Sequence, residues 1–111
     1  MKIRVLVVDD FPLVRDGLIA SLEVDPNIEV VGEAADGREG LDLARELRPD
    51  VAVIDMHMPG LGGRVLLSRI RNELPETRVL VVTASEDAQI LLEAVSEGAA
   101  GYLTKRVSGR D

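Results

Sequence analysis

Short apolar runs alternate with stretches of helical spacing along the chain, and this alternation constrains the fold more than any other feature. The apolar runs cover residues 3–8, 28–31, 51–54 and 79–82, with a weaker run at 101–103. Nearly continuous apolar runs of this length, bounded by polar residues, indicate strands that are buried on both faces of a sheet. Such strands need helices on both faces, which predicts a parallel sheet in an α/β fold.

The intervening stretches carry apolar side chains at the three- and four-residue spacing of an amphipathic helix. These stripes are Val14, Leu18 and Leu22; Gly40, Leu43, Ala44 and Leu47; Leu66, Leu67, Ile70 and Leu74; and Ile90, Leu91, Ala94 and Val95. Asp36 with Glu39 predicts a capped start of the second helix, and Pro49 and Pro75 follow the ends of the second and third helices. With right-handed crossovers, this order leaves few topologies for the sheet.

Composition excludes several classes of protein. The 111 residues suffice for one domain, whose core Val, Leu, Ile and Ala must fill because only 2% of the residues are aromatic. The chain has no cysteine, which excludes disulfides and thiolate metal sites and fits a reducing compartment. No apolar run is long enough to cross a bilayer. A net charge of −7 argues against a nucleic-acid surface on this domain. We therefore expect a cytoplasmic domain without membrane contact.

Polar residues follow four of the predicted strands, at the edge where a parallel sheet binds its ligands. Asp9 and Asp10 follow the first strand, Asp55 the third and Thr83 the fourth, and Lys105 comes soon after the fifth. If the first and third strands are neighbours, three carboxylates converge and repel one another. A divalent cation would relieve the repulsion, and oxygen-only ligands suit Mg²⁺. The sequence therefore predicts a magnesium site at this edge.

Each of these residues alone also has an ordinary structural interpretation. An Asp-Asp pair often forms a turn that caps a helix, a threonine at a strand end is often only a β-former, and most lysines are solvated. The functional interpretation gains weight because four strand ends supply a polar group to one edge of the sheet. His57 is the only histidine, and no cysteine or second histidine supports a transition-metal site.

The chain resembles the receiver domain of bacterial two-component response regulators over nearly all of its length. The matching motifs are Asp9-Asp10, Arg48-Pro49-Asp50-Val51, Asp55-Met56-His57-Met58-Pro59-Gly60, Val82-Thr83-Ala84 and Gly98-Ala99-Ala100-Gly101-Tyr102-Leu103-Thr104-Lys105. The last motif resembles the NarL/FixJ subfamily, whose members usually carry a LuxR-type helix-turn-helix output domain that binds DNA. The resemblance implies a doubly wound, five-stranded parallel sheet of flavodoxin-like order 2-1-3-4-5.

The resemblance also implies a phosphoacceptor function. Asp55 would receive a phosphoryl group from a sensor histidine kinase, and a carboxylate can form such an acyl phosphate. Mg²⁺ would be bound directly by Asp10, Asp55 and the backbone carbonyl of His57, and through water by Asp9. The domain would not be an enzyme beyond Mg²⁺-dependent autophosphorylation and autodephosphorylation.

Further roles carry over to residues near the C-terminus. Lys105 would pair with the phosphoryl group, and the Thr83 hydroxyl would contact it after transfer. Tyr102 would be the aromatic switch residue, although an aromatic at the edge of the core is an equally good interpretation. His57 and Ser85 would flank the phosphoryl group and tune its lifetime.

Some positions depart from the usual receiver pattern. Gly62 stands where an Asp frequently precedes Gly63, which would loosen the start of the third helix, and Arg106 replaces the proline that often follows the lysine. No fifth helix fits before Asp111, so we expect one receiver domain over residues 1–111, truncated before that helix, with any DNA-binding output domain outside this chain. The sheet face left open would be an apolar patch, so we expect either that more C-terminal chain existed but was disordered or removed, or that a second copy covers the face in a homodimer.

Three other functions are less well supported by the sequence. A Mg²⁺-dependent phosphohydrolase with an aspartyl nucleophile typically has a second acid two residues after the nucleophile, where His57 stands. A nucleotide-binding module needs a Gly-rich loop after the first strand, where Asp9-Asp10 would repel phosphates. An unphosphorylated, receiver-like interaction domain would not need the intact set Asp9, Asp10, Asp55, Thr83 and Lys105.

Overall fold

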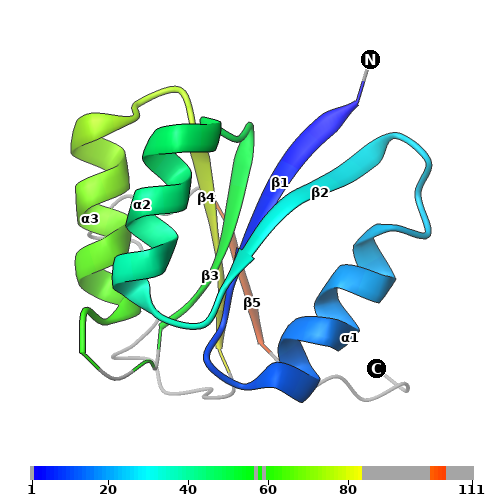
Figure 1. Cartoon of the computed structure of the whole chain (residues 1–111), viewed down its shortest axis with the longest axis horizontal. Helices are drawn as coiled ribbons and strands as arrows, with labels where there is room; N and C mark the ends of the chain where they lie inside the picture. The colour runs from blue at the N-terminus through cyan, green and yellow to red at the C-terminus, as the bar shows by residue number, and fades with distance from the viewer. Residues whose placement is uncertain (1, 57, 59, 84–100, 105–111) are drawn as a thin grey trace.

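The computed structural model describes residues 2–56, 58, 60–83 and 101–104 (Figure 1). Within them the elements follow in the order β1 (Ile3–Val8), α1 (Pro12–Leu22), β2 (Ile28–Ala34), α2 (Gly37–Leu47), β3 (Val51–Asp55), α3 (Gly63–Glu73), β4 (Arg78–Thr83) and β5 (Gly101–Thr104). The predicted fourth helix and the predicted break before a fifth helix lie outside the described residues. No helix in the described part of the chain is long and apolar enough to span a membrane.

The strands form one parallel sheet in the order β2-β1-β3-β4-β5, which confirms the predicted fold class. The register pairs Val8 with Ile54 and Asp55 with Val82. The carboxyl ends of β1, β3 and β4 therefore meet at one edge of the sheet. Strand β1 has its predicted bounds, whereas the other four are one to three residues longer than their apolar runs.

Helices α2 and α3 cover one face of the sheet and α1 lies against the other, as Figure 1 shows. The first face holds the larger core. Its buried members are Leu6, Val8, Ala34, Leu41, Ala44, Ala52, Ile54, Leu66, Leu67, Ile70, Leu74, Val79 and Val81. The second face buries Val5, Val7, Val53 and Val82, with half-buried side chains of α1 and β2 packed around them.

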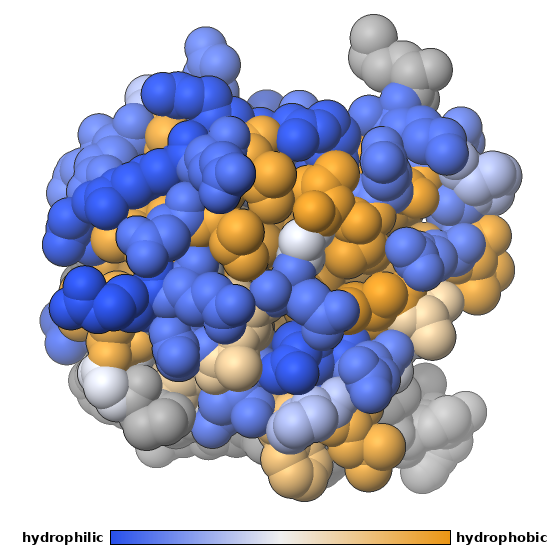
Figure 2. All heavy atoms as spheres, in the orientation of Figure 1, coloured by the Kyte–Doolittle hydropathy of each residue, from blue (hydrophilic) through white to orange (hydrophobic). Residues whose placement is uncertain are grey.

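Strand β2 is not buried on both faces, so the sequence-based expectation for its run was wrong. Glu29 and Glu33 are exposed, and most of its apolar side chains are only half-buried. The reason is position, because an edge strand has a neighbour on one side only. Figure 2 shows apolar side chains reaching the surface between α2 and α1, over this strand. Helix α1 likewise has no fully buried residue.

The caps of α2 follow the sequence closely. The Asp36 side chain accepts a hydrogen bond of 2.8 Å from the backbone N–H of Glu39, as the predicted capping box requires. The returning bond differs, because Glu39 Oε1 accepts from the N–H of Ala35, one residue before the cap, at 3.1 Å. The helix ends at Arg48, whose φ of 48° is left-handed. Pro49 then prevents the helix from continuing.

An ionic contact joins the exposed sides of α2 and α3. Glu73 Oε1 accepts from Arg45 Nε at 2.8 Å, and Glu73 Oε2 accepts from Arg69 Nε at 2.8 Å. These two hydrogen bonds lower the pKa of Glu73 to about 2. The pair of helices that supports the larger core is thus linked at its surface as well.

Candidate metal centre

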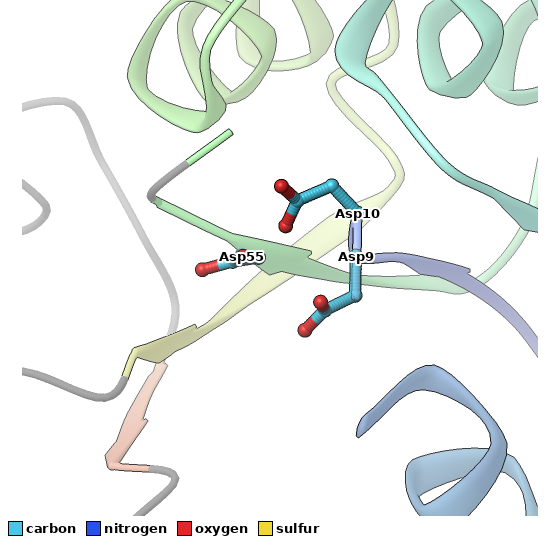
Figure 3. Close-up of side chains that lie close together, drawn as sticks. All are labelled: Asp9, Asp10 and Asp55. Atoms are coloured by element: carbon cyan, nitrogen blue, oxygen red, sulfur yellow. The ribbon is translucent and has the colours of Figure 1, made fainter. Parts of the chain in front are cut away.

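Three carboxylates converge at the carboxyl edge of the sheet. Asp9 and Asp10 follow β1, and Asp55 is the last residue of the neighbouring strand β3. One carboxylate oxygen from each lies within 4.8 Å of the others. Figure 3 shows the three side chains gathered at this edge. The sequence-based expectation that these acids would meet is therefore confirmed.

The three acids differ in exposure. Asp9 is 0% exposed and Asp55 is 3% exposed, whereas Asp10 reaches the solvent. Negative charges held this close repel one another, and a cation bound between them would relieve the repulsion. The donor set contains only oxygen, which suits a hard divalent cation such as Mg²⁺ better than a transition metal. The residues present therefore fit a magnesium ion, open to solvent on the Asp10 side.

Backbone hydrogen bonds fix the turn that carries Asp9 and Asp10. The N–H of Asp9 donates to the carbonyl of Ala34 in β2 at 3.1 Å. Asp9 Oδ1 accepts from the N–H of Phe11 at 2.9 Å, which bends the chain toward α1. The Asp9 carbonyl accepts from Arg15 Nη1 at 2.8 Å. Sequence reasoning did not single out Arg15, because a single arginine on a helix carries no signal of such a contact.

The backbone of Asp55 is fixed by close packing against the start of α3. Gly63, the first residue of α3, is buried there. A Cβ atom on Gly63 would overlap the backbone oxygen of Asp55 and would lie 2.6 Å from Cα of Met56. Contacts this short do not occur, so α3 can begin at this place only with glycine. Gly62, the residue before Gly63, makes no side-chain hydrogen bond that caps α3, as the sequence predicts.

Of the other predicted site residues, the structure describes the strand positions of two, Thr83 and Tyr102. Thr83 ends β4 beside Thr104, and Tyr102 pairs with Val81 in the same register. The backbone thus brings both residues to the half of the sheet that follows β3. His57 and Lys105 lie outside the described residues.

Comparison with known proteins gives a consistent result. The family model of the response regulator receiver domain matches residues 5–111. The transcriptional regulatory protein MctR of Rhizobium johnstonii is 43% identical over 107 residues, which are 96% of this chain and 50% of MctR. The chain spans about half the length of the curated relatives it matches.

Solved structures show the same likeness. The signal receiver domain of the response regulator NarL from Mycobacterium tuberculosis is 42% identical, with a TM-score of 0.91 over 96% of this chain and 86% of that one. The isolated receiver domain of RcsB from Salmonella enterica, solved with the phosphomimetic BeF₃⁻, is 27% identical. Its TM-score is 0.91 over 100% of this chain and 83% of its own.

Proposed function

The chain belongs to the response regulator receiver domain family, which is not a classical enzyme family, and we propose that Asp55 accepts a phosphoryl group from a sensor histidine kinase. The convergence of Asp9, Asp10 and Asp55 carries this proposal. Asp55 is the nucleophile because it alone ends the central strand β3, whereas Asp9 and Asp10 share one turn and can hold a cation together.

Asp10 and Asp55 would hold Mg²⁺ directly, together with the backbone carbonyl of His57, and Asp9 would hold it through water. When bound, the ion offsets the charge of the three carboxylates and of the phosphoryl oxygens. Asp55 supplies the oxygen that bonds to phosphorus, and the bond from phosphorus to the donor breaks, leaving an acyl phosphate. Lys105 and the Thr83 hydroxyl would contact the phosphoryl oxygens.

The same proposal extends to the parent protein and its partners. We infer that residues 1–111 form one receiver domain of a longer, cytoplasmic regulator that controls transcription and contacts DNA only through a region outside this chain. The half-length match to MctR, which is described as a transcriptional regulatory protein, supports this. A homodimer would bring two output regions to one DNA site. The chemistry of the receiver domain itself would be limited to Mg²⁺-dependent autophosphorylation and autodephosphorylation.

The direct test uses a small phosphodonor in place of the kinase. The purified chain, incubated with acetyl phosphate and Mg²⁺, should gain the mass of one phosphoryl group by intact-mass spectrometry. A chelator added before the donor should prevent the gain, because the acids then repel the incoming anion. A chain that gains no mass at any donor concentration would contradict the proposed function.

Asp10→Asn is expected to weaken Mg²⁺ binding by about tenfold or more, because the variant removes one charged ligand from a small oxygen site. Without Mg²⁺ the same variant should be more stable than the wild type, because one repelling charge is gone. Calorimetric titration with MgCl₂ and urea unfolding measure the two effects. Asp16→Asn, on the exposed side of α1, is the matched control and should alter neither. Unchanged Mg²⁺ affinity in Asp10→Asn would remove Asp10 from the site.

Phosphorylation is expected to couple Thr83 to Tyr102. The strand register supports this, because Asp55 pairs with Val82 next to Thr83, and Tyr102 lies on the adjoining strand. A phosphoryl group on Asp55 would draw the Thr83 hydroxyl inward and leave room for the Tyr102 ring. A structure with bound beryllofluoride should show both movements. Identical positions of Thr83 and Tyr102 with and without beryllofluoride would contradict the coupling.

A further inference from the structure

We propose that Arg15 is a positioning residue for the metal centre. Arg15 holds the Asp9-Asp10 turn in the shape that binds Mg²⁺, and Glu33 holds the Arg15 side chain in place. The inference rests on the proposed magnesium site and concerns two residues outside the acidic triad. Arg15 lies on α1 and Glu33 on β2, so the pair links two elements to the turn between β1 and α1.

The contacts of Arg15 show what it fixes. Its Nη1 donates to the Asp9 carbonyl at 2.8 Å, and its Nε donates to Glu33 Oε1 at 2.8 Å. The Arg15 side chain is 17% exposed and that of Glu33 is 51% exposed. Both bonds involve a charged group, which makes them shorter and stronger than neutral ones. The guanidinium can make them together because its donors are spread over a rigid plane.

The Asp9 carbonyl belongs to the peptide group that joins Asp9 to Asp10. Its orientation therefore sets where the Cα of Asp10, and hence its carboxylate, stands relative to Asp9. The N–H of Asp9 is already held by Ala34 in β2 at 3.1 Å. Arg15 holds the opposite side of the residue, so both backbone polar groups of Asp9 are fixed. Without Arg15, the peptide between the two metal-binding acids loses the hydrogen bond that orients its carbonyl.

Arg15 also brings a positive charge close to the triad, which alone would weaken the binding of a cation. Glu33 offsets that charge at 2.8 Å. Positioning therefore outweighs repulsion, and loss of Arg15 should weaken Mg²⁺ binding, whereas a purely electrostatic role would make it tighter. The sign of the change thus separates the two roles.

The test is calorimetric titration with MgCl₂ of the wild type and of Arg15→Gln, Arg15→Lys and Glu33→Gln. Arg15→Gln should bind Mg²⁺ about tenfold more weakly, the scale seen when groups that orient metal ligands are removed. Arg15→Lys, which keeps the charge and one donor to the carbonyl, should recover part of the affinity. Glu33→Gln keeps the Arg15–Asp9 bond and should show a measurable loss of affinity that is smaller than the loss in Arg15→Gln.

A matched control separates positioning from loss of stability. Arg45→Gln removes an arginine with the same kind of bond to a glutamate, Glu73, at 2.8 Å but on the α2–α3 side. It should lower stability and leave Mg²⁺ affinity unchanged. Unchanged or tighter binding of Mg²⁺ by Arg15→Gln would overturn the inference. If Arg15→Gln does not fold, a Glu33→Gln variant that binds Mg²⁺ as tightly as the wild type would overturn it instead. A wild-type chain that binds no Mg²⁺ would overturn the proposed site and this inference together.

Discussion

Asp55→Asn is expected to abolish the uptake of phosphate from acetyl phosphate. An amide oxygen carries no negative charge and cannot form an acyl phosphate, so the only carboxylate at the end of the central strand is lost. The fold should persist, because one of three mutually repelling acids is replaced by a neutral group of the same shape. Intact-mass spectrometry after incubation with acetyl phosphate and Mg²⁺ measures the uptake, and circular dichroism reports the fold.

Two other variants identify the reacting residue. Asp10→Asn keeps the nucleophile and should still gain a single phosphoryl group, more slowly because Mg²⁺ binds more weakly. Asp16→Asn, exposed on α1, should react like the wild type. A phosphoryl group retained in Asp55→Asn at the wild-type level would place the acceptor on another residue and refute the assignment.

The elements that could be predicted from the sequence are those whose apolar side chains are buried or half-buried, because burial leaves a pattern in the sequence. Nearly continuous apolar runs predict β1 and β3 closely, because both strands are covered on both faces and have neighbours on both sides. The three leucine-rich or alanine-rich stripes predict α1, α2 and α3. Strand order came from the resemblance to receiver domains, because the pattern alone left several topologies. Once β1 and β3 are neighbours, Asp9, Asp10 and Asp55 must meet.

Features that depend on three-dimensional contacts could not be predicted. Strand β2 extends past its apolar run because Glu33 and Ala34 pair with Val7 and Val8, and Gly32 and Glu33 interrupt the apolar pattern before Ala34. Arg15 reaches Asp9 because α1 turns back over the end of β1, which a helical stripe does not specify. Glu33 thus gains its role from strand β1, which is distant in the sequence, and Arg15 gains its role from the turn six residues before it.

Gly63→Ala is expected to lower the free energy of unfolding by about 2–3 kcal/mol, the upper part of the range for overpacking a close contact. The added Cβ would overlap the backbone oxygen of Asp55 and crowd Cα of Met56, and neither backbone atom can rotate away. Either α3 must start further out or the Asp55–Met56 peptide must shift. The first change opens the core under Leu66 and Leu67, and the second moves the proposed nucleophile.

Gly17→Ala is the matched control for this prediction. Gly17 lies in the exposed middle of α1, and a Cβ there would meet no atom within 4 Å. Alanine at that position should raise stability by about 0.5–1 kcal/mol, because glycine weakens a helix interior. Urea unfolding followed by circular dichroism measures both changes, which should have opposite signs. Phosphorylation by acetyl phosphate should slow in Gly63→Ala alone, because only there is the Asp55 backbone displaced. If both variants were equally stable and reacted equally fast, the packing of α3 against Asp55 would have no part in holding the site.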